Sequence, residues 1–434
     1  MIINTSKNRL SDSVKTLLVY YLVIILFMLL FTSPNAETSS IVRYGFLLAV
    51  FVPVISKKEM LPFVVVCFCA ISRQSFSPIL PSSSTIYLGI CMLFVLINND
   101  SIKIRINISI VLVTLYFILD SYLHYDVQGF IKWLIIALLL CMFIKDKISI
   151  DLLAISTIYI SLFLSLLFVV FGKYFQFNYL GLGDGELERI GWINPNEFGA
   201  TVACGLVVSV GYLLDVLKIE SSKYFKTLCW ITIGFALYVL LMNASRSSMI
   251  AASSAVLLFI LFSNKSISTK LLMCIGLIGI AIFILKSNMF ELFIRRIQDE
   301  DSMMSGSGRF VIWIDKINEF NNSNFGELLF GVGREKCNLI GLRPFSTHND
   351  FVTAFVGYGA IGLVLLIYVM VLPFVKASNN TKPVVISLMT FLILENCMME
   401  PFFRGNLLFY MLYSYIFMYS KNNSFEKTTQ MKLK

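Results

Sequence analysis

The sequence is poor in charged residues and in histidine. Charged residues make up 14% of the 434 residues, against roughly 25% in soluble domains. Hydrophobic residues make up 57%, so we interpret the chain as a polytopic membrane protein without a detached soluble domain. The net charge of +9 does not indicate nucleic-acid binding, because the basic residues are spread along the chain between apolar runs.

Several patterns that mark known chemistry are also absent from the sequence. It has no P-loop, no HExxH and no GxSxG pattern. The nine Cys are scattered, mostly within apolar runs, and Cys67 and Cys69 form an isolated CxC. We interpret the cysteines as small packing residues. We therefore expect no metal and no cofactor.

Apolar segments of near-spanning length recur along the whole chain. They lie at about 16–32, 41–56, 59–73, 83–97, 106–120, 128–144, 149–172, 197–217, 226–242, 246–263, 268–285, 348–375, 381–396 and 403–420. Several are shorter than the ~20 residues of a typical membrane helix, so we expect about 12 to 14 spans. The polar segment 1–15 leads into a retained first helix, because no A-x-A-like cleavage site follows it.

Connections rich in basic residues alternate along the chain with connections poor in them. The richer connections include both termini, which the positive-inside rule places in the cytoplasm. The two sides also differ in residue type, because the cytoplasmic side carries mostly Lys and the outer side mostly Arg. Arg offers a planar fork that holds phosphate or carboxylate in two places. This distribution indicates an oxyanion-binding outer face.

The longest polar segments divide the chain into four regions. We expect an N-terminal transmembrane bundle at 1–285 with a medium outer loop at 173–196, a large outer loop at 286–347, transmembrane helices at 348–420 and a cytoplasmic tail at 421–434. Arg309–Phe320 in the large loop follows the chain-breaking segment SGSG. Its periodicity predicts an amphipathic helix along the outer membrane face, with Phe310, Trp313, Ile314, Ile317 and Phe320 on one face and Asp315, Lys316 and Glu319 on the other.

The two histidines, His124 and His348, both fall on the outer side of this map. His348 follows an Arg-rich loop and opens an apolar segment. An imidazole, with an ordinary pKa near ~6.5, is suited to take a proton from a hydroxyl; the other interpretation is that His348 only caps a helix with Thr347 and Asn349. His124 has no Arg companions in DSYLHYD, and we interpret it as an interfacial residue.

The candidate anion-binding residues are arginines of the outer face. Arg246 lies in a connection so short that it must sit between two helix ends, and no acidic residue lies near it in sequence. Arg189 and Arg309 follow turn residues, and the alternative for each is an ion pair, with Glu186 or Glu188 and with Asp315. Further candidates are Arg334 and Arg343. We expect Glu395 and Glu400 to pair with Arg404.

These residues resemble the O-antigen ligase and polymerase family of bacterial surface-polysaccharide enzymes. His348 and Asn349, followed after nine residues by Gly359 and then by Gly362, reproduce the pattern H-[N/S/Q]-x9-G-x-x-[G/T/Y] of the ligases. The segments NASRSS, SGRFVIW and LLFGVGRE are similar to the family, and NPNEFGATVACG, which contains Asn196, resembles its Asn-rich entry to a middle helix. The resemblance covers about 185–370, and the N-terminal third matches only in hydropathy.

The resemblance implies an all-α, GT-C-like transmembrane bundle of the bacterial inner membrane with its active site on the periplasmic face. The implied activity is a metal-independent glycosyltransferase whose donor is a glycan on undecaprenyl diphosphate. Arginines would bind the diphosphate leaving group, His348 would activate the acceptor hydroxyl, and Asn349 and Asn196 would support them. The membrane lipids surround the lipid-linked substrate, and a chain-length regulator is left open as a partner.

The sequence is compatible with three alternative functions: polymerase, ligase and transporter. In a polymerase the acceptor is another lipid-linked repeat unit, and the A/T-rich character of the sequence, rich in Ile, Phe, Asn and Lys, favours it. In a ligase the acceptor is the lipopolysaccharide core, and the strict histidine pattern favours that. A transporter or flippase would line a route through the bundle and show two related halves. No such halves are visible in the sequence.

Overall fold

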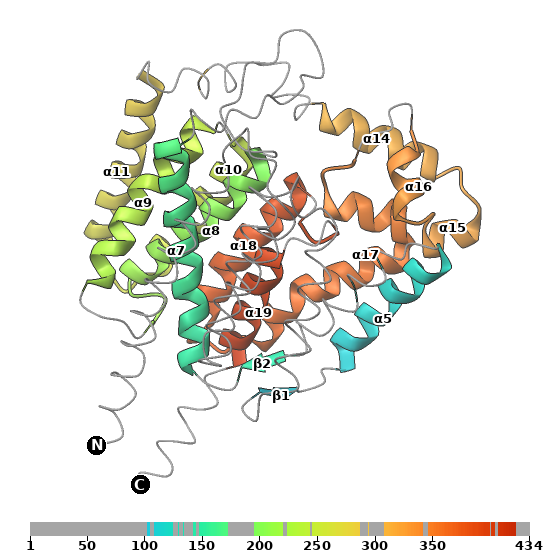
Figure 1. Cartoon of the computed structure of the whole chain (residues 1–434), viewed down its shortest axis with the longest axis horizontal. Coiled ribbons are helices and arrows are strands. Elements are labelled where there is room, and N and C mark those ends of the chain that lie inside the picture. Colours follow the sequence, from blue (N-terminus) through green and yellow to red (C-terminus); the bar gives the residue numbers. More distant parts are fainter. Residues whose placement is uncertain are drawn as a thin grey trace, which may run out of the picture. The chain divides into compact units, whose positions relative to one another are not determined.

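The computed structural model is an all-α polytopic protein. It describes residues 102–104, 108–124, 129, 133, 142–144, 147–171, 195–219, 224–243, 245–286, 294, 308–341, 346–399, 401–403 and 407–421. The helices in this part of the chain are α5 (Ile108–Leu123), α7 (Lys147–Phe171), α8 (Pro195–Leu213), α9 (Phe225–Met242), α10 (Arg246–Phe262), α11 (Ile267–Lys286), α14 (Arg309–Phe320), α15 (Phe325–Phe330), α16 (Arg334–Leu339), α17 (Asp350–Lys376), α18 (Lys382–Met398) and α19 (Leu407–Lys421) (Figure 1).

Four of the described helices are long and apolar enough to cross a membrane. These segments are Asp151–Val170, Phe225–Met242, Ile267–Lys286 and Asp350–Lys376. All four coincide with predicted spans, and α10 begins and ends within one residue of the predicted 246–263. The polytopic architecture is therefore confirmed for this part of the chain. The four spans predicted before residue 100 lie outside the described residues.

One predicted span ends differently in the structure. The apolar segment 128–144 ends in a short strand, β2 (Met142–Ile144), which pairs with β1 (Ile102–Ile104) in a two-stranded sheet. The helical prediction was wrong for these last residues. Three apolar residues of the type that favours extended backbone can satisfy their peptide groups by pairing with a second such segment.

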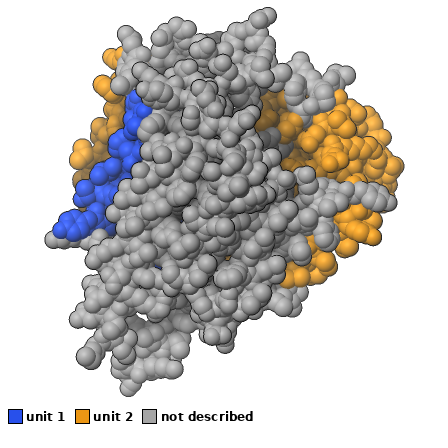
Figure 2. Space-filling model, in the orientation of Figure 1, with its two compact units in different colours: residues 1–103, 144–243 blue, residues 104–143, 244–434 orange. Residues whose placement is uncertain are grey.

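The chain forms two compact units, each made of separate stretches of sequence. The first comprises residues 1–103 and 144–243, and the second comprises residues 104–143 and 244–434 (Figure 2). In the first unit α7, α8 and α9 pack together. The helices α7 and α8 approach closely at Gly205, where a Cβ would lie 2.0 Å from Cβ of Ser161. The Ser161 hydroxyl donates to the Val202 carbonyl at 2.7 Å.

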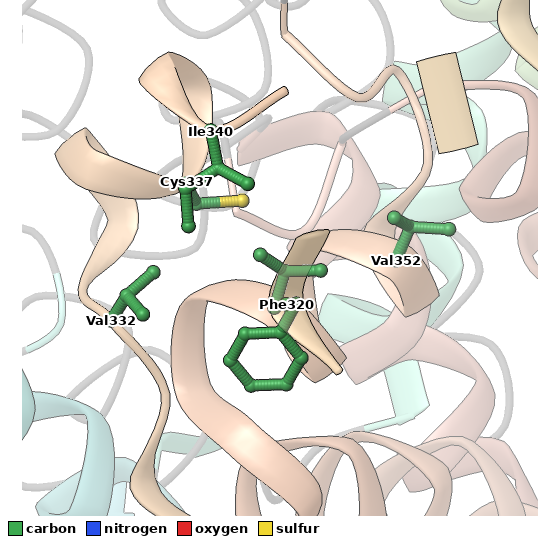
Figure 3. Packing of buried hydrophobic residues seen from close by; sticks show 6 residues of the cluster. Phe320, Val332, Cys337, Ile340 and Val352 are labelled. Atoms are coloured by element: carbon green, nitrogen blue, oxygen red, sulfur yellow. The ribbon is translucent and has the colours of Figure 1, made fainter. Parts of the chain in front are cut away.

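The second unit is built around the long helix α17. Helices α18 and α19 pack on it, α10 packs on α18, and α14, α15 and α16 cover its N-terminal part (Figure 1). Phe320 of α14 is fully buried in an apolar cluster with Val332, Cys337, Ile340, Val352 and Val356. Figure 3 shows Phe320 of α14 and Val352 of α17 together with Cys337 of α16 and its flanking residues Val332 and Ile340. This small core fixes the segment 308–341 on the start of α17.

The amphipathic helix is confirmed in its bounds, but the assignment of its two faces was partly wrong. Trp313, Ile317 and Phe320 share one face, as predicted, and that face packs on the protein's own apolar cluster. Ile314, by contrast, is 60% exposed and Lys316 is fully buried. The Nζ of Lys316 donates to the carbonyl oxygens of Cys337 and Ile340 at 2.6 and 2.7 Å. Burial of this ammonium is tolerated because the free carbonyls at the end of α16 accept its hydrogens.

Candidate functional site

His348 lies directly before α17 in an unusual backbone conformation. Its φ is +50°, in the left-handed region that few residues other than glycine adopt. Histidine is among the residues that tolerate this region, and such strain is found most often at functional positions. The neighbouring residues hold it there, because the Trp313 indole donates to the Thr347 carbonyl at 2.6 Å. The Asn349 N–H in turn donates to the Thr347 hydroxyl at 3.2 Å.

Asn349 and Asp350, which follow the histidine, fix the start of α17. The Asn349 side chain caps the helix by accepting from the N–H groups of Phe351 and Val352 at 2.8 and 3.1 Å. The helix cap predicted for this position therefore belongs to Asn349. The fully buried Asp350 carboxylate accepts from the backbone N–H groups of Phe402 and Phe403 at 2.8 and 3.0 Å. These bonds tie the histidine loop to the turn that follows α18.

Arg309 opens α14 after Gly308, whose φ of +79° breaks the chain before the helix. Its guanidinium donates to the Met398 carbonyl at 2.6 Å, which satisfies one of the free carbonyls at the end of α18. The predicted alternative for Arg309 was an ion pair with Asp315. The bond to Met398 joins this arginine to the end of α18, beside the turn that Asp350 holds, and the ion pair with Asp315 stays a prediction.

Arg246 is the first residue of α10, as its short connection predicted, and it is half-buried. Helix α10 packs on α18, and the two helices meet where Ser248 lies beside Glu395. Glu395 is 3% exposed and within electrostatic reach of Arg309. Neither oxygen of its carboxylate has a hydrogen-bond partner among the described residues.

Four helix ends of the second unit therefore meet around the candidate residues. The start of α10 carries Arg246, the start of α14 carries Arg309, and the start of α17 follows His348. The end of α18 contacts the start of α14 through the bond from Arg309 to Met398, and the start of α10 through Glu395 beside Ser248. The turn after α18 is bound to the start of α17 by Asp350. Arg246, Arg309 and His348 thus lie at helix ends that these contacts link.

Arg334 lies farther along α17 than the other candidates. Its Cα packs against Gly357, which is seven residues into α17 and therefore about 10 Å from the start of the helix. Arg334 opens α16 and is half-buried. Arg334 thus belongs, like Arg309, to the segment 308–341 that covers α17. It does not lie at the helix ends where Arg309 and His348 are found.

The turn before Arg334 packs against a break in α17 at Gly359. The φ of Gly359 is +69°, and a Cβ there would lie 2.3 Å from the Leu329 carbonyl oxygen. Gly331 is equally constrained, with φ +85° and 2.2 Å between an added Cβ and the Gly357 oxygen. Both positions require glycine, because any side chain would meet backbone atoms. Gly359 is also the first glycine of the histidine pattern, nine residues after Asn349. That glycine of the pattern therefore marks the break in α17.

A helix break leaves carbonyl groups without their usual partners. Three consecutive carbonyls of α17 are satisfied from outside the helix. Val332 N–H donates to the first, Val356, at 3.2 Å, and Gly333 N–H donates to the second, Gly357, at 2.9 Å. The third accepts a bond of 2.8 Å from the Tyr116 hydroxyl of α5. The break is thus a built feature that joins α5, the segment before α16 and α17.

The structure describes only part of the predicted site. Arg189, Arg343, Glu400 and Arg404 lie outside the described residues, so the expected pairing of the two glutamates with Arg404 stays a prediction. Asn196 is half-buried in α8 and belongs to the first unit, whereas the other described candidates belong to the second.

Sequence reasoning missed two features of the second unit. Glu395 was expected only as a partner of Arg404, and its burial next to Ser248 depends on the packing of α10 on α18. His124 was interpreted as an interfacial residue, yet its ring packs against Gly333, directly before Arg334. No local pattern in DSYLHYD signals a contact with a residue so distant in sequence. Among the described residues, no three His, Cys, Asp or Glu side chains come together as metal ligands.

Comparison with known proteins relates one part of the chain to a known family. The family model described as O-antigen ligase matches residues 231–367. This segment includes Arg246, Arg309, Arg334 and His348, and it ends within α17. No curated protein matches the chain. Residues 231–367, less than half of the 434-residue chain, are thus similar to the O-antigen ligase family.

Proposed function

We propose that this protein is an O-antigen or related surface-polysaccharide polymerase of the bacterial inner membrane. It transfers a glycan from undecaprenyl diphosphate to a sugar hydroxyl of another lipid-linked repeat unit. The reaction takes place at the periplasmic face, and both chain termini lie in the cytoplasm. The observation that carries the proposal is the geometry of His348, whose left-handed backbone is held by Trp313 and Asn349 where two arginine-bearing helix starts meet.

The proposed step is an in-line displacement at the donor's anomeric carbon. His348 takes the proton of the acceptor hydroxyl while the hydroxyl oxygen forms the new glycosidic bond. The bond between the anomeric carbon and the diphosphate oxygen breaks, and undecaprenyl diphosphate leaves with the bonding electrons. The displacement inverts the configuration at that carbon. Arg246 and Arg309 bind the diphosphate and offset its developing charge, and Arg334, Arg189 and Arg343 extend this anionic site.

A ligase is the second candidate, and the description of the matching family favours it. A ligase uses the same donor and the same base, and differs only in accepting a lipopolysaccharide core. Transport is the third candidate. The meeting of Arg246, Arg309 and His348 at one boundary of the second unit favours transfer chemistry over transport, because a transporter needs polar groups along a route between both faces.

A lipopolysaccharide gel from a strain deleted for this gene separates the candidates. A polymerase deletion leaves lipid A-core with a single repeat unit and removes the ladder. A ligase deletion leaves bare core while lipid-linked polymer accumulates in the membrane. A flippase deletion leaves single repeat units on the cytoplasmic leaflet, inaccessible to a periplasmic probe. Either of the last two results overturns the proposed function.

A further inference from the structure

His124 follows the last residue of α5, and a buried carboxylate fixes its ring. Its Nδ1 lies 2.9 Å from the carbonyl oxygen of Asp120 and 3.3 Å from the Asp120 carboxylate. Both neighbours are acceptors, so the ring proton must be on Nδ1. The Asp120 side chain is 7% exposed, whereas that of His124 is 37% exposed. Nε2 is therefore the ring nitrogen left to meet a ligand, and it has no hydrogen-bond partner among the described residues.

The imidazole is packed on the turn that leads into Arg334. A Cβ on Gly333 would lie 2.6 Å from the ring carbon Cδ2 of His124 and 3.1 Å from Nε2. Gly333 itself is fixed, because its N–H donates to the Gly357 carbonyl at 2.9 Å beside the break in α17. Helix α5 is fixed to the same break by the Tyr116 hydroxyl. The ring of His124 is thus held from two sides next to an arginine of the proposed site.

The chemistry of the ring decides which kind of ligand it takes. A sugar hydroxyl both donates and accepts, so it can pair with Nε2 in either hydrogen-bonding role of that nitrogen. The Asp120 carboxylate 3.3 Å from the ring repels a second anion such as a diphosphate. The paired carboxylate therefore favours a saccharide over a phosphate at this position.

We propose that His124 binds a hydroxyl of the acceptor glycan through Nε2, with Asp120 as the positioning residue that sets the ring. This proposal rests on the proposed polymerase function and names the acceptor side of that site. The competing interpretation is structural: Nδ1 only adds a second hydrogen bond to the Asp120 carbonyl, which also accepts the His124 backbone N–H at 3.0 Å. The two interpretations use different nitrogens of the same ring, so they are separable by substitution.

The experiment measures acceptor kinetics with the purified full-length protein in lipid nanodiscs. The donor is the lipid-linked repeat unit extracted from the strain that lacks this gene. The acceptor is the same oligosaccharide, released from the lipid by mild acid and labelled with a fluorophore at its reducing end. This acceptor carries no diphosphate and cannot act as a donor. Label that moves into longer chains reports transfer, and its dependence on acceptor concentration gives KM.

Four variants are compared with the wild type. His124→Ala removes both ring nitrogens. His124→Gln keeps a polar atom near the position of Nε2, and His124→Asn keeps one near Nδ1. Tyr122→Ala is the matched control, because Tyr122 lies on the same helix end and is 69% exposed. Asp120→Asn then tests the positioning role separately.

We expect His124→Ala to raise the acceptor KM about tenfold, the size of one lost hydrogen bond, with kcat and donor binding within about twofold of wild type. His124→Gln recovers part of this loss and His124→Asn does not. Asp120→Asn raises KM in the same direction, and Tyr122→Ala leaves KM unchanged. An unchanged KM in His124→Ala, or full recovery by His124→Asn, overturns the proposal while the polymerase function stands. A wild-type protein that extends neither this acceptor nor the lipid-linked repeat unit overturns the function, and the proposal falls with it.

Discussion

The indole nitrogen of Trp313 donates to the carbonyl oxygen of Thr347 at 2.6 Å, one residue before His348. This bond joins α14 of the large polar segment to the loop that carries the candidate base. Four residues earlier in α14, one turn of the helix away, Arg309 donates to the Met398 carbonyl at the end of α18. The short helix α14 thus holds the loop of His348 and also carries Arg309, an arginine of the proposed diphosphate site.

The first prediction concerns this bond. Trp313→Phe keeps an aromatic ring in the apolar cluster but leaves the Thr347 carbonyl without its donor. We expect polymer formation to fall about fivefold, because one lost hydrogen bond corresponds to roughly 1 kcal/mol, while the amount of protein in the membrane stays near wild type. Ile314→Ala on the exposed side of the same helix is the control. Equal ladders from both variants would contradict the role of Trp313.

A second prediction compares two glycines of α17. Gly359→Ala adds a methyl group 2.3 Å from the Leu329 carbonyl in a residue with φ +69°. The left-handed backbone alone costs about 1–2 kcal/mol, and the contact adds to it. Gly357→Ala meets nothing closer than 3.6 Å. We expect the first variant to unfold at lower temperature than wild type, and the second to match it. Thermal unfolding of the purified proteins measures the difference.

A third prediction concerns the buried lysine of α14. Lys316→Met keeps the length of the side chain but leaves the carbonyls of Cys337 and Ile340 without donors. Since each unpaired buried group costs about 1–3 kcal/mol, we expect a clear fall in unfolding temperature. Lys336→Met is the matched control, because Lys336 is exposed and forms only a surface ion pair with Glu327, worth about 0–1 kcal/mol. A larger effect of the control substitution would show that the ammonium of Lys316 is not stabilising.

A fourth prediction tests the diphosphate site. Arg309→Lys keeps the positive charge and the N–H donors of an ammonium group. It loses the planar guanidinium that holds an oxyanion at two places. We expect the KM for the lipid-linked donor to rise about tenfold or more. The control is Lys382→Gln, which removes a cation at the opposite end of α18 from Met398. If Arg309→Lys binds the donor as tightly as wild type, this arginine does not hold the diphosphate.

The sequence predicted those parts of the fold that depend on local patterns. Hydropathy placed α10 and α17 within two residues of their observed starts, and periodicity with a preceding glycine placed α14 at its observed bounds. The position of His348 directly before a helix followed in the same way. Each of these features is set by residues close together in the chain, where composition and spacing carry the information.

The missed features depend on contacts between distant segments. The side chain of Lys316 is buried where its ammonium meets the carbonyls at the end of α16. Periodicity within α14 carries no information on that contact, so it assigned Lys316 to the polar face. The left-handed backbone of His348 and the packing of His124 on Gly333 arise from the way α5, α14 and α17 meet. The glycine spacing of the histidine pattern was visible in sequence, but its cause is the broken helix. The role of each candidate arginine stays a prediction.

The central claim is that the imidazole of His348 carries the transfer step, and one measurement tests it most directly. His348→Asn is the best variant for this purpose, because asparagine also adopts left-handed backbone readily and so leaves the loop in place. The deletion strain is complemented with wild type or with His348→Asn at equal membrane levels, and the lipopolysaccharide ladder is compared. We predict that wild type restores the ladder and that His348→Asn leaves a single repeat unit. A full ladder from His348→Asn contradicts the claim.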